Sequence, residues 1–172
     1  IKDLAKACKF LDIKKPLFVT DQDLAKTKMV EEALEINKSK SLSIVVFSDL
    51  KGNPLGSSVK KGVDVFKNGN HDGVIAFGGG SSLDVGKSIV LQAALNRPLW
   101  DCADGGSFWN ENDYVESMAK NRIANPDNIK PFIAVPTTAG TGSETSRAAA
   151  IINDDTKVKK IVFHPRMLPT LT

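Results

Sequence analysis

Three consecutive glycines lie between an apolar segment and a helix-like segment, and this turn constrains the fold more than any other feature of the chain. The apolar segment spans residues 73–77, and Gly78, Gly79 and Gly80 follow it directly. Residues without a Cβ let the backbone turn sharply and let a bound group approach the main chain. The first N–H groups of a helix lack intrahelical partners, and the helix dipole favours an anion there. The pattern therefore predicts a strand, a tight turn and a helix whose first turn binds a phosphate.

Segments typical of strands and helices alternate along the chain. Short apolar runs that favour buried strands occupy residues 17–20, 42–47, 73–77 and 132–135. Apolar residues recur at helical spacing in residues 4–11, 24–36, 59–66 and 83–91. This alternation predicts an α/β fold with a mostly parallel sheet, helices on both faces and right-handed crossovers.

Two further segments depart from this alternation. Residues 100–128 are rich in Asp, Asn and Gly and show little periodicity. We expect a long loop there, with one short helix at 114–120. Residues 148–153 and 158–163 flank a turn at 154–155, which predicts a β-hairpin near the C-terminal end.

Length and composition indicate one globular domain and exclude several classes of protein. The chain has 172 residues, of which 41% are hydrophobic and 25% charged, with a net charge of +3. Its lysines are dispersed, so we expect no nucleic-acid partner. No apolar run approaches the ~20 residues of a membrane span, and no signal peptide is visible. We therefore expect no membrane partner and a cytoplasmic location.

Two well-known phosphate-binding fingerprints do not match the glycine turn. The dinucleotide fingerprint G-x-G-x-x-G requires a third glycine where this chain has Leu83. Residues 86–88 match the second half of the P-loop pattern G-x-x-x-x-G-K-[ST]. The first glycine that this pattern requires would be at position 81, where the chain has Ser81. These mismatches argue against a P-loop kinase or ATPase.

The residues after the glycines favour a well-capped helix. Ser81 can serve as the N-cap, and Asp84 can return a hydrogen bond to the Ser81 N–H as in a capping box. Asp84 and Lys87 are spaced for an ion pair one turn apart. A plain strand-to-helix turn is the structural alternative, but such a turn does not need three glycines.

A second polar loop follows the strand at 132–135. It contains Thr137, Thr138, Thr141 and Ser143, whose hydroxyls can bind phosphate or ribose. Both loops should lie at the carboxyl ends of parallel strands, where ligands bind in open α/β sheets. Alone, this loop could equally be a solvated turn.

Asp21 directly follows the first strand and has two interpretations. Its carboxylate can accept hydrogen bonds from ribose hydroxyls and repel a 2′-phosphate, which favours NAD over NADP. Alternatively, it caps the helix that follows. His71 and His164 have no second histidine at metal-ligand spacing, and Cys8 and Cys102 form no disulfide or metal framework. From its residues alone, the chain binds a nucleotide and shows no catalytic machinery.

Several motifs, in order along most of the chain, resemble a known family. They are Val19-Thr20-Asp21, Asn53-Pro54, the glycine turn with Ser81, Asp84 and Lys87, the run from Pro136 to Glu144, and the segment from Lys159 to Pro169. Together they resemble the N-terminal NAD(P)-binding domain of the iron-containing (group III, metal-dependent) alcohol dehydrogenases. The resemblance implies a Rossmann-like domain over residues 1–172.

The resemblance also implies which residues bind the cofactor. They are Asp21, Asn53, Gly78, Gly79, Gly80, Ser81, Asp84, Thr137, Thr138, Thr141, Ser143 and Lys159. The glycine turn would hold the pyrophosphate, with Asp21 at the adenosine ribose and the threonines on the adenine side. Asn53 and Lys159 would lie near the nicotinamide half, and Asp84 would support the loop.

By the same resemblance, the complete enzyme transfers hydride between a small alcohol and an aldehyde or ketone. Its divalent metal, iron or zinc, is held by an aspartate and three histidines in a helical second domain. That domain is absent from this chain, so we expect a fragment that has no catalytic residue or metal ligand and is inactive alone. The whole protein is expected to be a homo-oligomer, a dimer or larger. The alternative function is a non-catalytic nucleotide-binding module.

Overall fold

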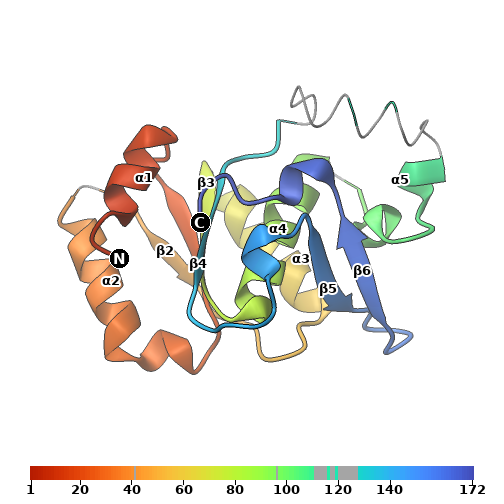
Figure 1. Cartoon of the computed structure of the whole chain (residues 1–172), viewed down its shortest axis with the longest axis horizontal. Helices are drawn as coiled ribbons and strands as arrows, with labels where there is room; N and C mark the ends of the chain where they lie inside the picture. The colour runs from red at the N-terminus through yellow and green to blue at the C-terminus, as the bar shows by residue number, and fades with distance from the viewer. Residues whose placement is uncertain (41, 96, 111–115, 117–118, 120–127) are drawn as a thin grey trace.

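The computed structural model describes residues 1–40, 42–95, 97–110, 116, 119 and 128–172 (Figure 1). The first half contains α1 (Leu4–Phe10), β1 (Pro16–Val19), η1 (Leu24–Lys26), α2 (Lys28–Lys38), β2 (Val45–Phe47) and α3 (Gly56–Asn68). It is followed by β3 (Gly73–Gly78), α4 (Gly80–Leu95), η2 (Leu99–Cys102), α5 (Ser107–Asn110) and β4 (Phe132–Pro136). The C-terminal part contains η3 (Ser143–Thr145), β5 (Ala148–Ile152), β6 (Lys159–Phe163) and η4 (Pro165–Met167). Among the described helices, none is long and apolar enough to cross a bilayer.

The central sheet has four parallel strands in the order β2-β1-β3-β4. Phe18 of β1 pairs with Val46 of β2 on one side and Ile75 of β3 on the other. The chain runs from β1 outward to β2, then crosses back to β3 and continues to β4. The strand order therefore reverses between β1 and β3, and such a switch point opens a crevice at the carboxyl edge of the sheet. The predicted parallel α/β fold is confirmed.

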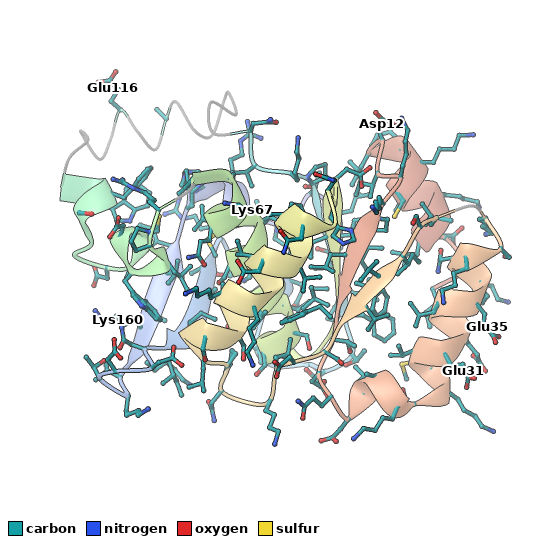
Figure 2. The ribbon with its side chains drawn as sticks, turned by 180° about the vertical axis from the view of Figure 1, so that it is seen from behind. Asp12, Glu31, Glu35, Lys67, Glu116 and Lys160 are labelled. Carbon is teal, nitrogen blue, oxygen red and sulfur yellow. The ribbon has the colours of Figure 1, made fainter. Side chains whose placement is uncertain are left out.

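Helices cover both faces of the sheet because the side chains of each strand alternate between them. Ile75 and Phe77 of β3 pack in one core with α1 and α2. Val74 and Ala76 of the same strand pack in the other core with α3 and α4. Figure 1 shows the two helix layers on opposite sides of the strands. Seen from behind, α3, which carries Lys67, lies in front of α4 (Figure 2).

The single helix predicted at 24–36 is wrong, because the segment divides at Thr27. Thr27 has an extended backbone (ψ 151°) and separates η1 from α2. Its hydroxyl donates to the carbonyl of Leu24 at 2.7 Å, which closes the short 3₁₀ turn. On α2, Glu31 and Glu35 point away from the sheet (Figure 2), while Val30 and Ala33 are buried.

Two other predicted elements differ in length from the observed ones. The strand expected at 42–47 is limited to β2, a three-residue edge strand. Conversely, α3 begins three residues earlier than the periodicity suggested, because Asp154 accepts a hydrogen bond from the Ser57 N–H at 2.8 Å. A carboxylate from a turn far along the chain thus caps this helix, and no local sequence pattern can predict such a cap.

The predicted hairpin is confirmed as β5 and β6, which form a separate antiparallel sheet with Ala150 opposite Ile161. Ile152 donates its N–H to the carbonyl of Pro54 at 2.9 Å, which attaches the hairpin to the segment before α3. In Figure 1 the hairpin is a separate unit, and α4 lies between it and the parallel sheet.

The short helix predicted at 114–120 falls almost entirely outside the described residues.

His164 lies in an apolar cluster at the end of β6. It is 0% exposed and contacts the rings of Phe108 and Trp109. Its Nδ1 accepts the Arg166 N–H at 3.1 Å. Burial, aided by the positive charge of Arg166, lowers the pKa of His164 to about 4. The imidazole is therefore neutral at physiological pH and serves packing.

The neutral state of His164 predicts a pH-dependent stability. Its pKa is about 4 folded and near 6.5 unfolded, so between these values the unfolded chain binds more protons and acid destabilises the fold. His164→Asn keeps an acceptor for Arg166 and does not titrate. From about pH 7 to about pH 4.5, the wild type should lose about 2–3 kcal/mol more unfolding free energy than this variant. Urea unfolding at the two pH values measures the difference, and equal losses would contradict the assignment.

Candidate functional site

The glycine turn connects β3 to α4 at the carboxyl edge of the sheet. Gly78 ends β3 with φ +149°, a conformation that side chains disfavour. Ser82 and Leu83 both donate their N–H groups to the carbonyl of Gly79, at 3.0 and 3.2 Å. Since α4 already begins at Gly80, Ser81 lies in its first turn, and the prediction that Ser81 is the N-cap is wrong.

The loop after β4 lies against the glycine turn, as the sequence predicted for two loops at the same sheet edge. The Thr137 N–H donates to the carbonyl of Gly78 at 3.0 Å. A Cβ placed on Gly79 would lie 3.3 Å from the Thr138 hydroxyl oxygen. The glycines therefore allow the two loops to pack closely.

A cavity of about 430 Å³ opens beside this junction. Of the twelve predicted site residues, Asn53, Gly80, Ser81, Asp84, Thr141, Ser143 and Lys159 line it. The other five are Asp21, Gly78, Gly79, Thr137 and Thr138, which do not line this cavity. Of these five, Gly78, Gly79, Thr137 and Thr138 form the adjacent strand ends described above.

Asp84 joins α4 to the opposite wall of the cavity. Its Oδ1 accepts the Ser143 hydroxyl at 2.6 Å, and its Oδ2 accepts the Ala150 N–H at 3.0 Å. The capping box predicted between Asp84 and Ser81 is therefore wrong, because both carboxylate oxygens are directed at residues far along the chain. The prediction that Asp84 pairs with Lys87 is confirmed at 3.2 Å.

Asn53 and Lys159 meet across the mouth of the cavity, although 106 positions separate them. The Lys159 ammonium donates to the Asn53 side-chain oxygen at 2.7 Å. Asn53 adopts a left-handed conformation, φ 54°, that asparagine tolerates better than most residues. Lys159 and Ile161 are two positions apart on β6, so their side chains share one face of the strand, and both line the cavity. The site thus has a positive group opposite the start of α4.

Asp21 follows β1, next to β3 in the sheet, and caps the turn after it. Its Oδ1 accepts the N–H groups of Asp23 and Leu24, at 3.1 and 2.8 Å. Asp21 therefore caps the turn that leads into η1, as the structural interpretation expected, although the N-cap residue of η1 itself is Asp23.

Several residues of the cavity wall were not among the predicted site residues. They are Pro54, Ser146, Ala148, Ala149, Ala150 and Ile161. Most belong to the hairpin, which was predicted as a structural element but not as part of the site. Strand alternation from Lys159 could have identified Ile161, and pairing across the hairpin could then have identified Ala150.

Neither histidine takes part in this site. His71 is 5% exposed, and its Nδ1 lies 2.8 Å from the carbonyl of Lys15. Among the described residues, no three His, Cys, Asp or Glu side chains are grouped in a way that could hold a metal ion. The described residues therefore do not fit a metal centre, whereas the donors around the cavity fit an organic phosphate.

Comparison with known proteins identifies the family. The sequence model of the iron-containing alcohol dehydrogenase family matches residues 1–172, and the chain belongs to this family. It is 36% identical over 171 residues to an NAD-dependent methanol dehydrogenase of Bacillus methanolicus. It is 32% identical over 174 residues to a 1,3-propanediol dehydrogenase of Citrobacter freundii.

A solved structure agrees with the sequence comparisons. A 1,3-propanediol oxidoreductase superposes with a TM-score of 0.83 at 30% identity, over 99% of this chain and 40% of that one. The match to the methanol dehydrogenase covers 99% of this chain and 40% of the relative. The chain thus spans about two fifths of the length of these relatives.

The conformation of Gly78 predicts a large effect of a single methyl group. A Cβ at Gly78 would lie 2.6 Å from the Ser82 oxygen, and its positive φ would add strain. Gly78→Ala should lower the free energy of unfolding by about 1–3 kcal/mol. The control is Gly52→Ala, since a Cβ at Gly52 would meet no atom within 4 Å. Denaturant unfolding of both variants is the measurement, and equal stability would show that Gly78 is not constrained.

Proposed function

We propose that this chain is the dinucleotide-binding domain of a metal-dependent alcohol dehydrogenase and that it binds NAD at the carboxyl edge of its sheet. The observation that carries the proposal is the cavity of about 430 Å³ between the start of α4, the loop after β4 and the hairpin. It opens at the start of α4, directly after β3, and β3 is one of the two strands that flank the switch point, where dinucleotides bind in open α/β folds. Family membership supports the same assignment.

The pyrophosphate would bind at the glycine turn. Gly80 and Ser81 belong to the first turn of α4, and both line the cavity. N–H groups in the first turn of a helix have no intrahelical carbonyl partner, so they can bind a phosphate. The 16-residue α4 directs its positive dipole end to the same place. Asp84 also lines the cavity, but Lys87 at 3.2 Å compensates its charge. The local field therefore favours an anion.

The two halves of NAD would extend from this point in opposite directions. Thr137 and Thr138 lie beside Gly78 and Gly79 and would contact the adenosine half, with Asp21 at its ribose. Asn53 and Lys159 lie on the hairpin side and would contact the nicotinamide half. The apolar floor under that half would include Ala148 and Ile161.

The reaction proposed for the whole protein is hydride transfer between a small alcohol and the corresponding aldehyde or ketone. A methanol dehydrogenase and a 1,3-propanediol dehydrogenase among the relatives support small alcohols as the substrate class. The role of this chain is to hold the nicotinamide in a fixed orientation, which is the contribution a protein makes to cofactor chemistry. Among its described residues, no group of side chains could hold a metal ion, so none of them is proposed as a metal ligand.

Binding of NADH tests the proposal directly. Bound nicotinamide should change its fluorescence on titration with the wild-type chain, and Mg-ATP should compete poorly. ADP binding as tight as NADH binding would favour a non-catalytic nucleotide module instead. The absence of NADH binding, or a preference for Mg-ATP, would overturn the proposal.

A side chain at Gly79 should block the pyrophosphate while leaving the fold intact. A Cβ there would approach only Thr138, at 3.3 Å, so the fold can adjust. Gly79→Val should raise the Kd for NADH by at least about tenfold, or about 1.4 kcal/mol. Thermal unfolding without nucleotide checks that the variant is folded. Unchanged affinity in a folded variant would remove the glycine turn from the site.

The charge of Asp21 should discriminate against NADPH. Asp21→Asn keeps an oxygen for the N–H groups of Asp23 and Leu24 but removes the charge that repels a 2′-phosphate. The ratio of the Kd values for NADPH and NADH should fall by about tenfold, or about 1.4 kcal/mol. Asp23→Asn is the matched control, because the Asp23 side chain is 98% exposed. An equal ratio in both variants would place Asp21 outside the site.

A further inference from the structure

The buried ammonium group of Lys87 lies behind the cavity wall that faces the glycine turn. Lys87 is 0% exposed on α4, one turn after Asp84. Its Nζ donates to the carbonyl of Ser143 at 2.9 Å, to that of Ser146 at 3.3 Å and to that of Ala148. The Asp84 carboxylate lies 3.2 Å from the same atom. Four oxygens therefore surround one nitrogen.

These contacts require the charged form of the side chain. An ammonium group has three N–H donors, whereas a neutral amine has two, and all four neighbours of Nζ are acceptors. Burial lowers the pKa of Lys87 from its ordinary value, and the carboxylates of Asp84 and Glu144 act in the opposite direction. The oxygen shell is the kind that compensates a buried cation.

The three carbonyls belong to the segment 143–148, which forms one side of the cavity. Ser143, Ser146 and Ala148 all line the cavity, and only Ala148 belongs to a strand. Their carbonyl dipoles point at one place, an arrangement that is repulsive without a positive charge at its centre. Removing Lys87 would also leave the Asp84 carboxylate uncompensated beside the proposed phosphate site.

We propose that Lys87 is a positioning residue that organises the segment 143–148 as a bound monovalent cation would, and so fixes the wall of the cavity against which the cofactor packs. Lys87 is not one of the residues that line the cavity, so it acts through the main chain of this segment. The identity of the cofactor rests on the proposed function, whereas the effect of Lys87 on the segment does not.

The effect on the segment is measurable without any nucleotide. Lys87→Met keeps an unbranched side chain, one atom shorter than that of lysine, but removes its charge and donors. Amide hydrogen exchange in residues 143–150 should become at least about tenfold faster than in the wild type, while exchange in β1 and β3 stays unchanged. The matched control is Lys60→Met, the same substitution at an exposed position of α3. Unchanged exchange in residues 143–150 of the Lys87 variant would overturn the inference.

Affinity for NADH then separates this inference from the proposed function. Lys87→Met should raise the Kd for NADH by about tenfold or more, and Lys60→Met should not change it. Wild-type affinity in the Lys87 variant would overturn the inference alone. A wild type that binds no NADH would overturn the proposed function, and the hydrogen-exchange result would still decide the role of Lys87.

Chemical rescue distinguishes a missing cation from a general loss of packing. Lys87→Ala leaves room for propylammonium, which replaces the missing three carbons and the ammonium group. Added propylammonium should restore slow exchange in residues 143–150 and raise the unfolding temperature. Its isomer trimethylammonium, which is branched at nitrogen and has one N–H donor in place of three, should not. If Lys87→Ala folds only with propylammonium, the inference is supported equally. Failure of propylammonium to change exchange, unfolding temperature or folding yield would overturn it.

Discussion

The ion pair between Asp84 and Lys87 is the interaction on which the geometry of the cavity depends. Both residues lie on α4, but their partners are in the loop after β4 and in the hairpin. The same helix packs closely on the sheet, since a Cβ at Gly86 would lie 2.8 Å from both Ala76 and Phe132. One rigid helix therefore positions the sheet, the polar loop and the hairpin relative to one another.

The walls of the cavity consist mainly of main chain and small side chains. Glycine, serine, threonine and alanine supply most of the lining, and Lys159 supplies a charge at its mouth. The shape of such walls is set mainly by the backbone, so it depends little on the identity of large side chains.

The sequence predicted what depends on local pattern and missed what depends on distant contacts. The alternation of strands with helices and the hairpin follow from the periodicity of apolar residues. The position of the glycine turn follows from three consecutive residues without a Cβ. The predicted capping box was wrong because Asp84 accepts hydrogen bonds from Ser143 and Ala150, which no local sequence pattern places near it. The division of the helix at Thr27 and the capping of α3 by Asp154 have the same origin. The family resemblance implied that Asn53 and Lys159 lie near the same half of the cofactor. Their direct hydrogen bond could be seen only in the structure.

The hairpin adds a mechanical property to the site. Its strands pair with each other and, apart from the single bridges Leu55–Ile152 and Ala103–Val162, share no described strand pairing with the rest of the chain. A shift of the hairpin would therefore break no hydrogen bond of the parallel sheet. The hairpin is held instead through α4, because Asp84 and Lys87 of this helix bond to Ala150 and Ala148 of β5. The width of the cavity therefore depends on side chains of one helix, not on strand pairing with the sheet.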